Sequence, residues 1–276
     1  MSSVTGRFAP SPTGDLHLGN LRTAMAAHAS ARAQGGRFLV RFEDLDRVTS
    51  SHERASQQLI DLDSVGVRWD EAPVFQSDRF AMYEDVLTLL MGRGLTYECF
   101  CSRREIREAA EAPHGGQAAY RGTCRDLTDA ERDERRAKRP PALRLRSEGV
   151  AVSFVDVRFG LVSGSADDVV LRRNDGVPAY NLAVVVDDAD QGITEVVRGE
   201  DLLGVTASQV ALQNLLGLPT PVYHHVPLML GDDGERLAKR HGAVTLADMA
   251  AQGCSADEVA AMLWDDLRTW FPYGKP

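Results

Sequence analysis

The sequence predicts an α/β protein built around a doubly wound parallel sheet. Three features at the start of the chain support this fold class: a short strand-like segment at residues 4–9, a turn rich in proline at residues 10–14, and an alanine-rich helical segment at residues 19–33. A second strand-like segment follows at residues 37–43. Strand, glycine-bearing loop, helix and strand, in this order, form the opening unit of such a sheet.

The later elements are predicted from periodicity and capping residues. Two further helical patterns lie at residues 52–63 and 78–93. Strand-like segments lie at residues 143–157, 169–173, 181–186 and 195–198, and the last two are expected to be core strands. Capping boxes at Thr206 and Ser255 predict helices that end at Gly217 and near Trp270. Near Thr96 the composition changes to a stretch with few aliphatic residues.

This change of character predicts a division of the chain into four parts. They are the first half of the sheet core at residues 1–95, an insertion at 96–180, the second half of the core at 181–242, and a short helical C-terminal part at 243–276.

The composition is that of an ordinary globular protein. Apolar residues make up 43% of the 276 residues and charged residues 26%, which argues against global disorder and collagen-like repeats. No apolar run is long enough to span a bilayer and the first residues show no signal peptide, so we expect a cytoplasmic protein without a membrane partner.

The charge distribution leaves two interpretations open for one segment. The whole chain has a net charge of −9, yet residues 121–146 hold nine basic and five acidic residues, a local net of +4. This segment is either a solvated helix with many ion pairs or a surface that faces phosphates.

Two segments have the composition of phosphate-binding loops. Residues 10–20 place His17 and Gly19 directly before a predicted helix, where free backbone N–H groups favour anions. Residues 234–242 place Lys239 between two arginines in a loop bounded by glycines, as expected for neutralising a developing pyrophosphate. Taken alone, each could also be an ordinary surface loop.

These segments resemble the glutamyl-type class I aminoacyl-tRNA synthetases. Residues 6–20 are similar to the opening of that family, with His17-Leu18-Gly19-Asn20 at its "HIGH" signature and Asn in place of the last histidine. Residues 236–240 lie at the "KMSKS" position and depart from that pattern, but Lys239 matches the catalytic lysine. Residues 41–47, 66–71 and 178–204 also resemble the family, so the likeness covers nearly the whole chain.

The resemblance implies a Rossmann-type class I synthetase core that activates L-glutamate with ATP and Mg²⁺. His17 and Lys239 would be catalytic, and the ATP site would comprise His17, Gly19, Asn20 and Lys239. The family's glutamate-contacting positions fall on Arg7, Phe8, Ala9, Pro10, Ser11, Glu43, Tyr180 and Arg198. Their chemistry fits, because arginines bind carboxylates, a glutamate accepts from an ammonium and a tyrosine donates.

The length of the chain favours one branch of the family. A full glutamyl-tRNA synthetase continues into a helical anticodon-binding domain, whereas this sequence stops at Pro276. The resemblance therefore implies the truncated branch that places glutamate on the queuosine base of tRNA(Asp), activates glutamate without tRNA and acts as a monomer. The alternatives are an ordinary glutamyl-tRNA synthetase fragment, an inactive tRNA-binding module and an adenylating enzyme for another acid.

Three of the four cysteines predict a metal site. Cys99, Cys101 and Cys124 fall within 26 residues, a pattern that either binds zinc or places thiols in a core. His114 is the chemically better fourth ligand, because tyrosine has a pKa of about 10. The resemblance instead implies Tyr120, which with Cys124 matches the family's Tyr-x-x-x-Cys arrangement. Four protein ligands would make this one zinc structural.

Overall fold

The computed structural model describes residues 3–102, 104–106, 120, 122–229, 244–269 and 271. Its first half contains a parallel sheet in the order β1-β2-β3. The strands are β1 (Thr5–Phe8), β2 (Arg37–Phe42) and β3 (Val74–Phe75). The helices α1 (Leu18–Ala33) and α2 (His52–Ser64) connect them. Most of β2 is buried, as expected for a central strand covered on both faces.

The second half of the chain adds strands on the other side of β1, away from β2 and β3. Strands β9 (Glu195–Gly199) and β10 (Val222–Val226) pair in parallel and are joined by η2 (Glu200–Leu202) and α7 (Leu203–Leu216). The backbone N–H of Thr194 donates to the Thr5 carbonyl at 2.9 Å, which brings β9 alongside β1. The strand order therefore reverses between β1 and β9, and ligands bind at such a switch point, outside the carboxyl ends of the strands.

A hairpin continues this second sheet. Strands β6 (Ala151–Asp156) and β7 (Gly160–Ser165) are antiparallel, and β6 pairs with β10. Residues 151–165 thus extend the sheet of the second half, although they lie within the sequence range expected for the insertion. The four-part division of the chain stays a prediction.

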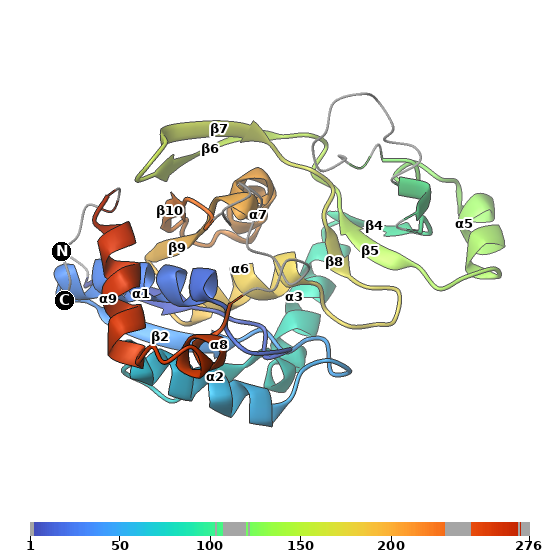
Figure 1. Cartoon of the computed structure of the whole chain (residues 1–276). Coiled ribbons are helices and arrows are strands. Elements are labelled where there is room, and N and C mark those ends of the chain that lie inside the picture. Colours follow the sequence, from blue (N-terminus) through green and yellow to red (C-terminus); the bar gives the residue numbers. More distant parts are fainter. Residues whose placement is uncertain are drawn as a thin grey trace.

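A smaller antiparallel sheet lies at one end of the molecule (Figure 1). It contains β4 (Thr96–Cys99), β5 (Ala142–Leu145) and β8 (Val170–Arg172), and α5 (Asp129–Arg136) lies beside it. The helices α3 (Phe80–Gly92) and α6 (Tyr180–Asp190) lie between this sheet and the parallel strands, and η1 (Gln76–Asp78) precedes α3. At the opposite end, α9 (Ala256–Leu267) follows α8 (Leu246–Ala251) and packs against α1.

The predicted fold class is confirmed, and two of the predicted elements are wrong. Residues 181–186 are not a strand but part of α6. A short apolar run that is fully buried can be either a strand or a buried helix, because it shows no periodicity. Here all six residues from Leu182 to Asp187 are buried. Thr206 does not cap α7, which begins at Leu203; its hydroxyl instead donates to the Leu202 carbonyl within the helix.

The other capping predictions are correct. The Ser255 hydroxyl accepts from the backbone N–H of Glu258, and the Glu258 carboxylate accepts from that of Ser255, which begins α9. Gly217 ends α7 with a left-handed backbone, φ +68°.

In the part of the chain described here, no helix combines the length and apolar character needed to cross a membrane.

Candidate active site

A cavity of about 410 Å³ opens at the carboxyl ends of the parallel strands. Its walls come from segments far apart in the sequence: the end of β1, the start of α1, the residue after β2, the start of α6, and the residues that follow β9 and β10. Among the lining residues are Arg7, Phe8, Ala9, His17, Gly19, Asn20, Glu43, Tyr180 and Arg198. The structure therefore brings most of the predicted glutamate and ATP residues into one cavity.

The start of α1 forms one wall and has an unusual cap. His17 precedes the helix, and its Nδ1 accepts from the backbone N–H of Asn20 at 3.2 Å, while the Asn20 side chain accepts from the His17 N–H at 3.3 Å. Because Nδ1 is the acceptor, the proton of the neutral imidazole lies on Nε2. His17 can therefore present an N–H donor to an anion at a helix N-terminus.

Pro10 and Ser11 do not line this cavity. The Pro10 carbonyl accepts from the backbone N–H of Glu43 at 2.9 Å, so it positions the residue after β2. Ser11 lines an adjoining cavity of about 690 Å³, which shares Glu43 and Tyr180 with the first. Lys239 lies outside the described residues.

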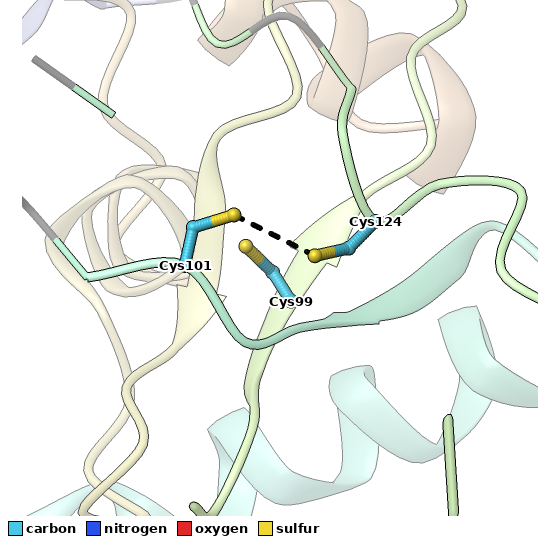
Figure 2. Close-up of side chains that lie close together, drawn as sticks. All are labelled: Cys99, Cys101 and Cys124. Carbon is cyan, nitrogen blue, oxygen red and sulfur yellow. Dashed lines mark hydrogen bonds between the residues drawn. The ribbon is translucent and has the colours of Figure 1, made fainter. Parts of the chain in front are cut away.

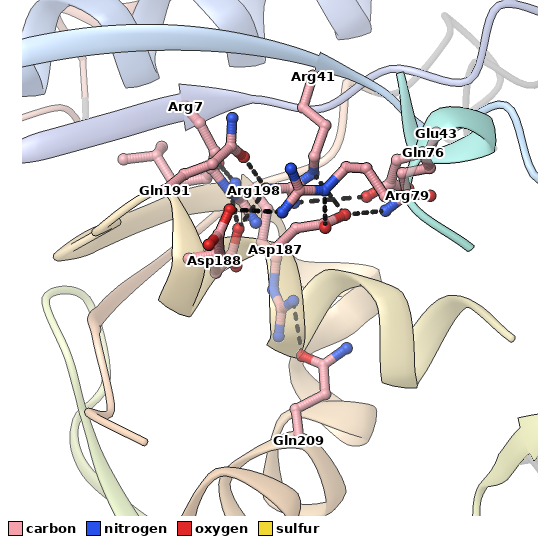
Figure 3. Close-up of polar contacts among 12 residues, drawn as sticks. Arg7, Arg41, Glu43, Gln76, Arg79, Asp187, Asp188, Gln191, Arg198 and Gln209 are labelled. Atoms are coloured by element: carbon pink, nitrogen blue, oxygen red, sulfur yellow. Dashed lines mark hydrogen bonds and ion pairs between the residues drawn. The ribbon is translucent and has the colours of Figure 1, made fainter. Parts of the chain in front are cut away.

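Glu43 is held by a buried network of charges (Figure 3). Fully buried Arg41 lies 3.8 Å from the Glu43 carboxylate and also pairs with Asp188 at 2.8 Å and Asp187 at 3.5 Å. Arg7 pairs with Asp188 at 3.3 Å. Burial raises the pKa of Glu43 to about 7, although Arg41 and Arg7 act in the opposite direction. This carboxylate can accept from a substrate ammonium at neutral pH.

Tyr180 and Arg198 are two further polar groups of the cavity. Burial raises the pKa of Tyr180, so its hydroxyl stays protonated and can donate. The buried guanidinium of Arg198 lies at the end of β9 and faces the cavity with a charge that can bind a carboxylate.

The sequence analysis missed several residues that shape this site. It assigned no role to Arg41, Asp187, Asp188, Arg22 or Asp201. Arg22 and Asp201 line the cavity directly, whereas the others hold Arg7 and Glu43. One signal was present: an arginine inside the otherwise apolar strand Phe38–Phe42 needs a buried acidic partner.

The three clustered cysteines lie together beside the small sheet (Figure 2). All their sulfur atoms lie within 4.8 Å of one another, and the Sγ atoms of Cys101 and Cys124 are 3.6 Å apart. The hydroxyl oxygen of Tyr120 lies 3.3 Å from the Cys99 Sγ and 3.7 Å from the Cys101 Sγ. The predicted tyrosine is therefore at the cluster, and His114 lies outside the described residues.

The separations of 3.6, 3.3 and 3.7 Å are close to those of a tetrahedral metal site. Zinc bonds of about 2.3 Å to sulfur and about 2.0 Å to oxygen place two sulfurs about 3.8 Å apart and a sulfur and an oxygen about 3.5 Å apart. Donors from nearby groups also surround the cluster: the N–H of Phe100 and the Arg135 guanidinium both approach the Cys124 Sγ. Such donors stabilise thiolates.

The basic segment at residues 121–146 consists largely of ion pairs in its described part. Arg125 pairs with Asp168, Arg136 with Glu98 and Arg139 with Glu105. Arg132, Lys138 and Arg146 also have acidic partners. The first of the two interpretations, a solvated helix with many ion pairs, describes these residues in part, since only Asp129–Arg136 are helical and Ala142–Leu145 form a strand.

Comparison with known proteins identifies the family. The family described as tRNA synthetases class I (E and Q), catalytic domain, matches residues 3–270. The chain is 60% identical to a glutamyl-Q tRNA(Asp) synthetase of Nocardia farcinica, over 95% of this chain and 84% of that protein. The chain belongs to the glutamyl-Q tRNA(Asp) synthetase family of class I tRNA synthetases. The resemblance inferred from the motifs is thus confirmed.

Glutamate–tRNA ligases are more distant relatives of this chain than the Nocardia protein is. The chain is 42% identical to the ligase of Pelobacter propionicus over 89% of its own length but only 53% of that protein. Among solved structures, the glutamate-tRNA synthetase from Elizabethkingia anophelis matches with a TM-score of 0.76 and 26% identity. That match covers 94% of this chain and 65% of the other, slightly less than two thirds.

Proposed function

We propose that this protein activates L-glutamate with ATP and transfers the glutamyl group to the queuosine base in the anticodon loop of tRNA(Asp). The observation that carries the proposal is one cavity lined by two kinds of group: buried arginines together with Glu43, and a helix N-terminus capped by His17. The first set suits an amino acid with two carboxylates, and the second suits phosphates. The names of relatives such as the Nocardia protein support the tRNA acceptor.

The first step follows from the placement of these groups. An oxygen of the glutamate α-carboxylate attacks the ATP α-phosphorus, and the bond to the bridging oxygen breaks to release pyrophosphate. An ionised carboxylate is already nucleophilic, so the step needs orientation and charge stabilisation rather than a general base. In the proposal, Arg7 and Arg198 bind carboxylates, Glu43 accepts from the ammonium, and His17 donates through Nε2 to a phosphate oxygen. Lys239 stabilises the leaving pyrophosphate.

Two metal ions belong to the proposal. Mg²⁺ would arrive with ATP and neutralise phosphate charge, and Asp201 offers a carboxylate on the cavity wall for it. One zinc would be held by Cys99, Cys101, Cys124 and Tyr120, whose separations fit a tetrahedral site. Because all four ligands would come from the protein, this zinc would be structural.

The transfer step can be tested directly. Purified protein, ATP and labelled glutamate are incubated with tRNA(Asp) that does or does not contain queuosine, and the product is digested with a nuclease. We expect label only on the queuosine-containing tRNA, in a fragment from the anticodon loop. In a parallel reaction with tRNA(Glu), label on its 3′-terminal adenosine would instead indicate an ordinary glutamyl-tRNA synthetase.

Further expectations accompany this proposal. Glutamate-dependent exchange between ATP and pyrophosphate should occur without tRNA, and an inactive tRNA-binding module would show none. Exchange with another acid at higher efficiency would favour a different adenylating enzyme. The cytoplasmic location and the monomeric state are retained as predictions, the second to be checked by light scattering of the purified protein.

A further inference from the structure

Arg198 is a buried cation whose described protein partners are all neutral. The residue is only 5% exposed. Its Nε donates to His225 Nε2 at 3.1 Å, and its two terminal nitrogens donate to Gln209 Oε1 at 2.8 Å and Thr206 Oγ1 at 2.7 Å. Figure 3 shows the contact with Gln209. By contrast, Arg7 and Arg41 are paired with carboxylates.

Neutral acceptors leave the charge of Arg198 available to a substrate. They satisfy the N–H groups and fix the plane of the guanidinium, but they do not cancel its charge. A buried cation without a counter-ion is costly, and an anion entering the cavity removes that cost. The orientation of Arg198 therefore depends on the three groups that accept from it and on the Tyr223 ring, whose centroid lies 5.0 Å from the guanidinium carbon.

His225, one of these three groups, is held in place by Asp156. It lies on β10 and is fully buried, and Asp156 Oδ2 contacts both its Nδ1 at 2.7 Å and its backbone N–H at 3.0 Å. Burial and the charge of Arg198 lower the pKa of His225 to about 4, so the ring is neutral. The single ring proton then lies on Nδ1 and is donated to Asp156, which leaves Nε2 to accept from Arg198.

Asp156 is itself fixed by the turn that follows β6. Its Oδ1 accepts from the backbone N–H groups of Arg158 at 2.9 Å and Phe159 at 3.0 Å. A chain of contacts thus runs from the β6–β7 turn through Asp156 and His225 to the guanidinium in the cavity.

We propose that His225 is a positioning residue, which holds Arg198 in the orientation that binds the glutamate substrate, with Asp156 fixing its tautomer. This inference rests on the proposed function. Loss of the acceptor at Nε2 leaves the Nε–H of Arg198 buried without a partner, and the guanidinium must rotate to satisfy it. The loss should therefore affect glutamate binding more than ATP binding.

Two substitutions of His225 separate this role from simple packing. In His225→Gln the amide oxygen can reach the former position of Nε2 and accept from Arg198. In His225→Asn the shorter side chain ends near the position of Nδ1, so it can contact Asp156 but not Arg198. His224→Asn is the matched control, because His224 is also buried on β10 and its ring stacks on Phe271 instead.

The readout is glutamate-dependent exchange between ATP and pyrophosphate, together with the melting temperature of each variant. We expect His225→Asn to raise the KM for glutamate by about tenfold or more, the size of one hydrogen bond to a charged group, with the KM for ATP changed by less than about twofold. His225→Gln should restore most of the glutamate KM. His224→Asn should lower the melting temperature and leave that KM unchanged.

Equal effects of the Asn and Gln variants on the KM for glutamate, or no effect of His225→Asn, would contradict this inference alone. A wild-type protein that activates no glutamate would contradict the proposed function as well, so the two failures are distinguishable.

Discussion

At the scale of single residues, the candidate site is governed by how each buried charge is compensated. Arg41 touches three carboxylates, Glu43 shares that arginine with two aspartates, and Arg198 has only neutral partners among the described residues. Burial alone would raise the pKa of Asp188, but Arg7 and Arg41 outweigh it and the pKa is lowered. Asp188 therefore stays ionised, while Glu43 titrates near neutrality.

The raised pKa of Glu43 predicts a pH dependence of glutamate binding. The charged groups facing this carboxylate are Arg41, Arg7, Asp188 and Asp187, and the shift places its pKa at about 7. Only the ionised form accepts from an ammonium, so at pH 6 about a tenth of it is competent. We expect kcat/KM for glutamate in the exchange reaction to fall about tenfold from pH 8 to pH 6.

The variant Glu43→Gln is the control for this effect. It should have a low kcat/KM that no longer changes over that range, and a profile identical to wild type would assign the titration to another group.

The free energy of unfolding should change with pH in the opposite direction to kcat/KM. The folded-state pKa of Glu43 lies above the ordinary value of 4.5, so ionisation opposes folding and stability falls as the pH rises from about 4.5 to 7.

Lys239 supports a second prediction at this scale. The substitution Lys239→Ala should lower adenylate formation by roughly 10²- to 10³-fold, as expected when one preorganised charge stabiliser is lost, with little change in the KM for glutamate. Exchange between ATP and pyrophosphate measures this. Lys138→Ala is the control, since Lys138 is an exposed lysine paired with Glu134 of α5. Exchange near the wild-type rate in Lys239→Ala would overturn the catalytic assignment.

At the scale of elements, the start of α1 couples helix capping to the chemistry of the cavity. Gly19 is the second helical residue, and a Cβ added there would lie 3.1 Å from the His17 ring. The absence of a side chain thus lets the imidazole fold back over the helix start and accept from Asn20 through Nδ1. One element therefore supplies both the helix dipole and the donor.

The substitution Gly19→Ala tests this coupling. Alanine favours the helix by roughly 0.5–1 kcal/mol, which offsets the loss of the His17 cap, so stability should change little, but the displaced ring should lower kcat about tenfold. Gly92→Ala is the matched control. Gly92 is the last residue of α3, and a Cβ added there would meet no atom within 4 Å, so alanine should stabilise the protein without changing kcat. Melting curves and exchange kinetics give both quantities, and wild-type kcat in Gly19→Ala would remove the proposed role of the ring.

At the scale of the whole molecule, the cysteine cluster has its own small core. Tyr97, Cys99, Phe100, Tyr120 and Cys124 form this group, which is separate from the larger clusters beneath the sheets. So few apolar side chains bury little surface, and a metal would compensate for the small core. The Arg144 guanidinium over the Tyr120 ring, at 3.9 Å, adds one further contact.

The zinc prediction follows from this organisation. Elemental analysis should find about one zinc per chain. The double substitution of Cys99 and Cys101 by Ser should abolish it, and Tyr120→Phe should weaken its retention. His114→Ala and Cys254→Ser should leave it unchanged, because Cys254 lies against the main core instead. Zinc lost in His114→Ala and retained in Tyr120→Phe would transfer the fourth position to His114.

Removal of the metal should also act locally. A chelator should expose the segments around Cys99 and Cys124 to protease while the parallel sheet stays resistant, since the cysteine cluster and that sheet have different cores. Simultaneous cleavage throughout the chain would show that the metal supports the whole fold.

Much of this organisation could be predicted from local sequence. The opening strand–loop–helix–strand unit, the caps at Ser255 and Gly217, and the convergence of His17, Glu43 and Arg198 followed from short-range patterns and family motifs. The helix caps and turns can be read from neighbouring residues, because they satisfy backbone groups within a few positions.

Tertiary structure alone decided the rest. The run at residues 181–186 is helical, and because Leu182 to Val186 are all buried, no periodicity remained in the sequence to reveal its conformation. The pairing of Arg41 with Asp188, and the contact from Asp156 through His225 to Arg198, join residues 27 to 147 positions apart. The sequence determined which charged residues are present, but the fold decided which charges are neutralised and which face the cavity, because desolvation and distance depend on packing.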